Sequence, residues 1–147
     1  MKRLCRLAAP AAAAGLAACT VFAPPPPAPA PSDACGALNE SLAAAVPPGE
    51  SLADLQARGV RVRTPLSFPP GSAPRASQSG GAVVRLMIQP DGSVAPGSPR
   101  TVKSVGEAQI AAATEAAALS MSFDFDAGTR PAGPIPFTTV YAACARS

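Results

Sequence analysis

The sequence predicts a small α+β domain in which one helix packs on an antiparallel sheet, carried behind an export signal and a proline-rich tether. Three observations support this fold class. Residues 82–89 alternate in polarity as a strand does, an alanine-rich run with helical spacing follows, and residues 135–144 form a further strand-like segment. The resulting order β-β-α-β is typical of a helix segregated to one face of a sheet, and 147 residues suffice for one such domain.

Composition and charge narrow the function classes. The formal charge of +3 includes Lys2, Arg3 and Arg6, and without them nine basic side chains remain against nine acidic ones. A nucleic-acid interface needs a dense basic face, and the one local basic cluster, within residues 58–63, is interpreted as a solvated charge run. We therefore expect no nucleic-acid partner.

The first 18 residues have the layout of a signal peptide. A positive start is followed by the apolar stretch Leu7 to Leu16, which is too short for a permanent membrane span. The sequence Leu16-Ala17-Ala18-Cys19 resembles a lipobox. That resemblance implies that Cys19 is acylated (as by palmitate) and becomes the first residue of a lipoprotein. The alternative is an ordinary secretory signal cleaved near Ala18.

The residue after the modified cysteine is Thr20 rather than Asp. In Gram-negative bacteria, resemblance to lipoproteins then implies sorting to the periplasmic face of the outer membrane, although the choice between inner and outer membrane stays open. Two or more acyl chains hold a protein stably on a bilayer, whereas one anchors it only marginally. We expect the membrane to be a partner through these chains.

Prolines dominate residues 23–31, which read APPPPAPAP. Such a run favours extended polyproline II, a semi-rigid spacer that spans about 28 Å at about 3.1 Å per residue. The expected organisation is a signal peptide (1–18), the lipidated cysteine with a proline-rich linker (19–36), a short helical and strand lead-in (37–64) and the folded domain (65–147).

Two of the four cysteines remain for pairing. Cys5 leaves with the signal and Cys19 is acylated, so Cys35 and Cys144 form an even set in an oxidising compartment. We predict a disulfide between them, with two unpaired thiols as the alternative. The chain has no His, and two distant cysteines do not make a zinc site, so we expect no metal and no cofactor.

Short elements are expected in the lead-in. Residues 37–45 and 50–58 are helix candidates, stopped by a Pro-Pro-Gly sequence and by Gly59, and residues 60–63 are a short strand candidate. The loop 65–79 is rich in Pro, Ser and Gly.

The ordered region begins with a predicted hairpin. Residues 82–89 form the first arm, with Val84, Leu86 and Ile88 on one face. Pro90, Asp91 and Gly92 each suit a position in a tight turn. The return arm runs through residues 93–105, with its cleanest strand at 100–103.

A helix is predicted over residues 107–121. Ser104 and Glu107 fit a capping box at its start, and one apolar face would pack on the sheet through Ile110, Ala113, Ala117 and Met121. Residues 135–144 form the last strand.

These segments together resemble the C-terminal domain of the TonB family of energy transducers. The resemblance spans about residues 65–143. It rests on residues 81–92 (GAVVRLMIQPDG), on residues 102–106 before the helix, on the Phe-containing segment at 123–125, and on residues 133–137 (GPIPF). Unlike TonB, the chain has a cleaved lipid signal where the family has a membrane-spanning helix, and its tether is much shorter than the periplasm is wide.

The resemblance implies a binding mode. TonB-like domains engage partners by strand addition, in which an extended segment pairs with an exposed sheet edge. Residues 135–143 are the candidate edge, unless that strand is central or closed by another strand. The candidate partner-binding residues are Ile135, Phe137, Thr139 and Tyr141. A homodimer through the same strand is also possible.

Catalysis is not expected. Asp124 and Asp126 form the one close carboxylate pair, and their alternation with phenylalanines indicates a strand with Phe inward and Asp solvated. The predicted function is a non-enzymatic, periplasm-facing lipoprotein that binds an envelope protein by strand addition, with a possible link to TonB-dependent transmembrane transport. The alternative is a structural or accessory lipoprotein that binds peptidoglycan or a small ligand.

Overall fold

The computed structural model describes residues 31–75 and 78–144, and the side chains from residue 35 onward. The expected signal peptide, Cys19 and most of the linker lie outside the described residues. Helix α1 (Pro31–Ala43) and helix α2 (Leu52–Ala57) precede strand β1 (Val60–Thr64). Strands β2 (Gly80–Ile88) and β3 (Arg100–Val105), helix α3 (Ala108–Ala118), and strands β4 (Ser122–Phe125) and β5 (Ile135–Ala143) follow.

The sheet confirms the predicted α+β class and its hairpin. Strand β2 is central, with β3 antiparallel on one side and β5 antiparallel on the other. A turn joins the hairpin arms, since the Gly92 amide donates to the Gln89 carbonyl at 2.9 Å. β1 and β4 form a separate two-stranded sheet, with Val60 opposite Phe125.

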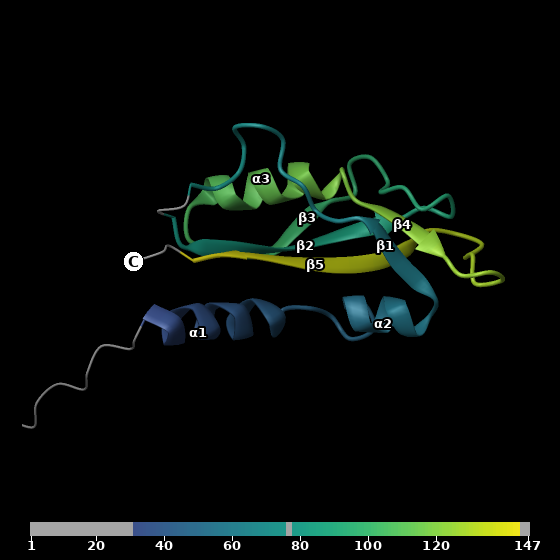
Figure 1. The fold of residues 1–147 in the computed structure, drawn as a ribbon, viewed down its shortest axis with the longest axis horizontal. Helices are drawn as coiled ribbons and strands as arrows, with labels where there is room; N and C mark the ends of the chain where they lie inside the picture. The colour runs from purple at the N-terminus through teal and green to yellow at the C-terminus, as the bar shows by residue number, and fades with distance from the viewer. Residues whose placement is uncertain (1–30, 76–77, 145–147) are drawn as a thin grey trace, which may run out of the picture.

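The arrangement has three layers, which corrects the expectation of a single packed helix. Figure 1 shows α3 on one side of the sheet and α1 and α2 on the other. On the α3 side, Val84 and Leu86 of β2 share a core with Ala118 and Phe123. This core also contains Leu55 and Val60 from the lead-in, so residues 37–64 fold together with the later segments.

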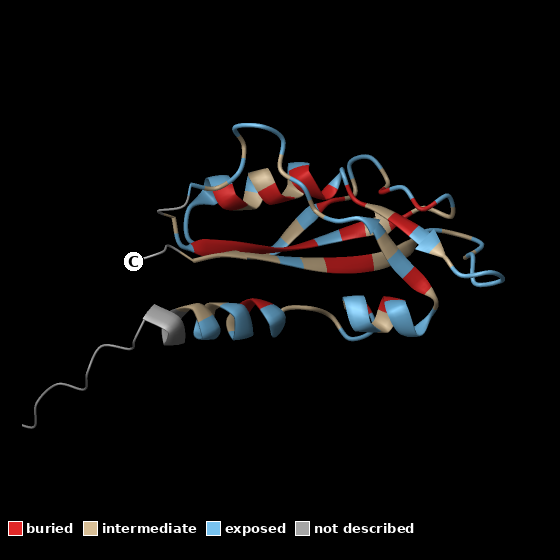
Figure 2. Ribbon diagram, viewed as in Figure 1, coloured by how far each residue is buried: buried red, intermediate tan, exposed pale blue. Residues whose placement is uncertain are grey.

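The second face of the sheet is covered by α1. Cys35, Leu38 and Leu42 follow the spacing i, i+3, i+7, which places them on one face of that helix, and Leu42 is fully buried. A Cβ added to Gly81 of β2 would collide with Leu42, so the helix approaches the strand closely. Figure 2 shows the same pattern, with burial on β2 and exposure along the outer side of α1. α1 begins at Pro31, inside the segment expected to be linker.

The start of α3 differs from the prediction. β3 continues to Val105, Gly106 follows at φ +92°, and Glu107 is itself the N-cap with no side-chain capping bond. The predicted capping box at Ser104 and Glu107 is therefore wrong. A capping box instead begins α2, where Ser51 and Asp54 satisfy each other's amides.

The buried face of α3 also differs in part. Ile110 and Ala117 are buried as predicted, while Ala113 is half-buried and Thr114 is fully buried. The Thr114 hydroxyl donates to the Ile110 carbonyl at 2.6 Å, which satisfies it inside the core.

Candidate functional site: the outer edge of β5

β5 is an edge strand of the described three-stranded sheet, because its one strand neighbour there is β2. Its nine residues pair with β2 in continuous register from Ile135 opposite Ile88 to Ala143 opposite Gly80. The sequence left open whether this strand is central or at an edge, and in the structure it lies at an edge.

Hydrogen bonds fix which backbone groups of β5 point away from β2. The Thr138 amide donates to the Glu50 carbonyl at 2.9 Å, so it is directed outward. Met87, which lies opposite Pro136 in the register, directs its amide to the other side of β2, where it donates at 3.1 Å to Oγ of Ser98, just before β3. The backbone amide and carbonyl groups of successive residues point alternately toward and away from the neighbouring strand in an antiparallel pair. The outward positions of β5 are therefore 136, 138, 140 and 142.

The first half of this edge has no free amide donor. Pro136 has no amide hydrogen to offer, and the amide of Thr138 is already bonded to Glu50. No hydrogen bond is found at the outward groups of Val140 and Ala142 within the described part of the chain. The edge available for pairing is therefore the second half of β5, which we call the open edge (residues 139–143).

Glu50 lies in the connector between α1 and α2 and is held by its side chain. Its carboxylate accepts from Arg85 Nε at 2.8 Å, from Arg85 Nη2 at 2.5 Å and from Thr138 Oγ1 at 2.8 Å. Glu50 is 8% exposed. Burial raises the pKa of its carboxyl, but the hydrogen bonds from Arg85 and Thr138 and the Arg85 charge outweigh burial, so the pKa lies below its ordinary value.

An apolar groove runs beside the edge. It has a volume of about 460 Å³ and lies between the α1–α2 connector, the segment after β1, and β5. Its walls carry no charged side chain. The lining residues used below are Val46, Leu52, Pro65, Leu66 and Val140. Leu52 is 43% exposed and Val140 is 38% exposed, so this surface is accessible.

The four residues predicted to bind a partner occupy the odd-numbered positions of β5, which alternate with the outward positions. Phe137 is buried and packs edge-to-face on Phe123, with ring centroids 5.4 Å apart. Tyr141 packs on Phe68 at 4.7 Å. Ile135 and Thr139 share this face of the strand, opposite Ile88 and Val84. Their role in partner binding stays a prediction, and their backbone groups point toward β2.

Glu50 and Val140 were not predicted from the sequence. The sequence does contain a signal for which positions of β5 face outward, because a proline inside a strand is tolerated where its missing amide would point away from the neighbouring strand. Pro136 thus marks 136, 138 and 140 as outward positions. Nothing local marks Glu50, which meets Thr138 across 88 residues of sequence.

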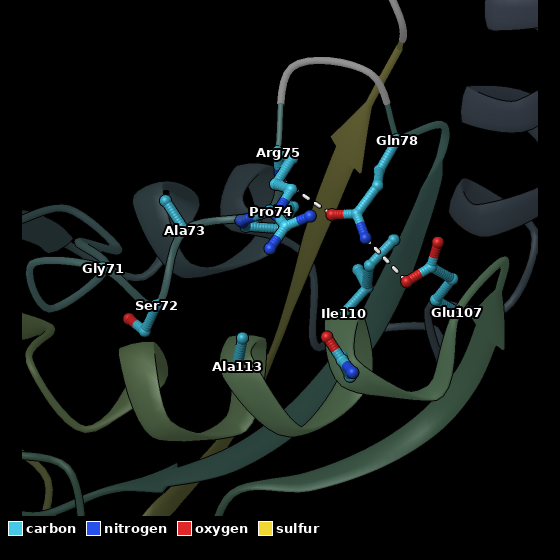
Figure 3. A pocket seen from close by; sticks show the side chains of 10 residues that line it. Gly71, Ser72, Ala73, Pro74, Arg75, Gln78, Glu107, Ile110 and Ala113 are labelled. Carbon is cyan, nitrogen blue, oxygen red and sulfur yellow. Dashed lines mark hydrogen bonds between the residues drawn. The ribbon is translucent and has the colours of Figure 1, made fainter.

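A second hollow lies between residues 71–75, Gln78 and the start of α3 (Figure 3). Its volume is about 480 Å³, and Arg75, Gln78 and Glu107 line it. The Gln78 side chain accepts from the Arg75 amide at 2.7 Å and donates to Glu107 at 2.6 Å, so these groups satisfy one another.

The carboxylates of Asp124 in β4 and Asp126 just after it are solvated and ion-paired. Asp124 pairs with Arg63 and Asp126 with Arg61, while Phe123 is buried, which confirms the predicted alternation. The hydrogen bond from Arg63 holds the pKa of Asp124 below its ordinary value. Among the described residues, no cluster of His, Cys, Asp and Glu is large enough to hold a metal ion.

Cys35 and Cys144 form the predicted disulfide, with Cα atoms 5.9 Å apart. The bond ties α1 to the residue after β5, next to the open edge. Within the described ranges, no helix has the length and hydropathy needed to cross a bilayer.

Comparison of the chain with protein-family models, with curated proteins and with solved structures gave no match.

Proposed function

We propose that this protein is a non-enzymatic lipoprotein of the bacterial envelope, anchored through Cys19, that binds an extended segment of an envelope protein by strand addition to β5. The observation that carries the proposal is the open edge. Val140 and Ala142 direct backbone donors and acceptors outward, and Val140 also lines the apolar groove, an arrangement that suits strand addition.

The order of elements supports the TonB-like part of the proposal. A hairpin (β2 and β3), a helix (α3) and a closing strand (β5) follow one another, and the closing strand lies at a sheet edge. A partner that belongs to TonB-dependent transport would suit this resemblance. The lipid anchor rests on residues 16–19 and places the domain on the periplasmic face of a membrane, with the outer membrane as the proposed site.

The test is photo-crosslinking in intact cells from the full-length protein. A photo-reactive residue at Val140 should give a discrete adduct with an envelope protein. The matched control is Leu119, which is 50% exposed but lies at the end of α3, away from the groove. Cys19→Ser should release the protein from the membrane fraction.

Equal adducts at both positions, or none at Val140, would count against strand addition. An adduct at twice the protein's own mass would indicate a homodimer. Co-sedimentation with purified sacculi without any protein adduct would favour the alternative of a peptidoglycan-binding accessory lipoprotein.

A further inference from the structure

Glu50 occupies the place of a partner strand at one position of β5. Its backbone carbonyl accepts the outward amide of Thr138 at 2.9 Å, as the carbonyl of an added strand would. Its side chain accepts the Thr138 hydroxyl at 2.8 Å. A single residue therefore takes up both the main-chain donor and the side-chain donor of Thr138.

The connector that carries Glu50 is held at several points. Arg85 donates twice to the carboxylate, and Arg58 Nη2 donates to the Gly49 carbonyl at 2.9 Å. On the other side of Glu50, the capping box of α2 fixes Ser51 through Asp54. A bidentate pair with Arg85 adds direction as well as strength, so the carbonyl of Glu50 is held in front of Thr138.

Pro136 extends the closure by one more outward position. A strand that approached from this end would find no amide at 136 and an occupied amide at 138. Among the outward positions of the described strand, Val140 and Ala142 keep both an amide and a carbonyl without a hydrogen-bond partner, and together they offer about four main-chain hydrogen bonds in an antiparallel or parallel ladder.

We propose that Glu50 is a stop that sets the register and the length of the strand that β5 accepts. This inference rests on the proposed function. The partner segment pairs with residues 139–143 and ends before Thr138, so it is about five residues long. Because the groove wall carries Leu52, Leu66 and Val140 and no charged side chain, the segment presents an apolar residue there.

Glu50 is a positioning residue in this account. Natural sheets also cover their edges to prevent aggregation, and a cap of that kind would act in the same place. A stop differs from such a cap because it limits how far along β5 a bound partner strand extends. Crosslinking from positions on either side of Thr138 measures that extent.

The first measurement is amide hydrogen exchange by NMR on the full-length protein in detergent micelles, without partner. We expect slow exchange at Thr138 and fast exchange at Val140 and Ala142. Glu50→Ala should speed exchange at Thr138 roughly 10- to 100-fold. Glu50→Gln keeps an acceptor for Thr138 and Arg85 and should restore slow exchange. Unchanged protection at Leu86, whose amide faces β5, checks that the fold persists.

The second measurement is photo-crosslinking in cells from position 134, which is exposed just before β5, and from position 142, with Pro136 kept in every variant. In the wild type, we expect partner adducts from 142 and none from 134. In Glu50→Ala, adducts should appear at 134 as well, and Glu50→Gln should return them to the wild-type pattern.

Three outcomes would contradict the proposed role of Glu50 as a stop. Fast exchange at Thr138 in the wild type, wild-type adducts at both positions, or a Glu50→Ala pattern that stays confined to 142 would overturn it. If no adduct forms even at 142, the proposed function fails, whereas the exchange data still decide whether Glu50 occupies Thr138.

Discussion

Gly92 is the residue at which the hairpin turn meets β4. Its φ is +87°, its amide closes the turn on Gln89, and its carbonyl accepts the Phe123 amide at 2.8 Å. A Cβ at this position would collide with the Phe123 carbonyl. Both the turn and the contact between the hairpin and β4 therefore require glycine here.

Gly92→Ala should lower the free energy of unfolding by about 3 kcal/mol or more, since a left-handed residue costs about 1–2 kcal/mol and the backbone collision adds to that. Gly97→Ala is the matched control, because Gly97 has φ +71° but open space around its Cα. It should lose about 1–2 kcal/mol. Chemical denaturation measures both, and equal losses would contradict the role given to the Phe123 contact.

Local residue patterns predicted the turn at 90–92 and the Phe–Asp alternation of β4, because both depend on neighbours in the sequence. The capping box at Ser104 failed for a physical reason. Pairing with β2 extends β3 to Val105, so Ser104 is used in a strand and cannot cap the helix. The Glu50 contacts could not be predicted, since they join residues far apart in the sequence.

Helix α1 is attached to the sheet at both ends. Cys35 bonds to Cys144 near its start, and near its end Lys103 Nζ donates to the Ser41 carbonyl at 2.7 Å and to Ser41 Oγ at 2.8 Å. A cation at a helix C-terminus also complements the helix dipole. The helix itself is short and contains Gly36, so packing and these two ties hold it in place.

Removing the disulfide should loosen α1. The bond closes a loop across 109 residues, for which the chain-entropy model gives about 4–5 kcal/mol. The double variant Cys35→Ser/Cys144→Ser should lose up to that amount of unfolding free energy. Reductant should destabilise the wild type similarly and leave the double variant unaffected. A loss below about 1 kcal/mol in both comparisons would mean that Leu42 and Lys103 suffice to hold the helix.

At the scale of the element, β2, β3 and β5 were predicted within a few residues because their alternation and turn signals are strong. α1 was predicted to begin six residues later than it does. Among its described side chains (35–43), the apolar face has three positions, and its contact with β2 depends on Gly81, which no local pattern relates to Leu42.

In the described residues, the three-stranded sheet is covered on both faces, and β5 has an unpaired backbone along part of its outer edge. The sequence patterns predicted the α+β class and the hairpin–helix–strand order, but they indicated only a lead-in for residues 37–64. In the structure, Leu55 and Val60 complete the core, and Glu50 occupies the outward amide of Thr138 on β5. Long-range contacts of this kind follow from tertiary packing, and they convert a fully exposed edge into a short one.

The proposed function requires that a partner pair with the outward backbone of β5. The most direct test is proline substitution at an outward amide, which removes a donor to the partner and leaves the bonds to β2 in place. Val140→Pro does this on β5. Ser104→Pro is the matched control on β3, because Ser104 lies opposite Ala82, whose amide faces β5, so the Ser104 amide also points away from β2.

With a photo-reactive residue at Ala142 in each background, we predict that Val140→Pro lowers the partner adduct about tenfold or more and that Ser104→Pro leaves it within about twofold. Undiminished adduct in Val140→Pro, or an equal loss in both variants, would contradict strand addition at β5.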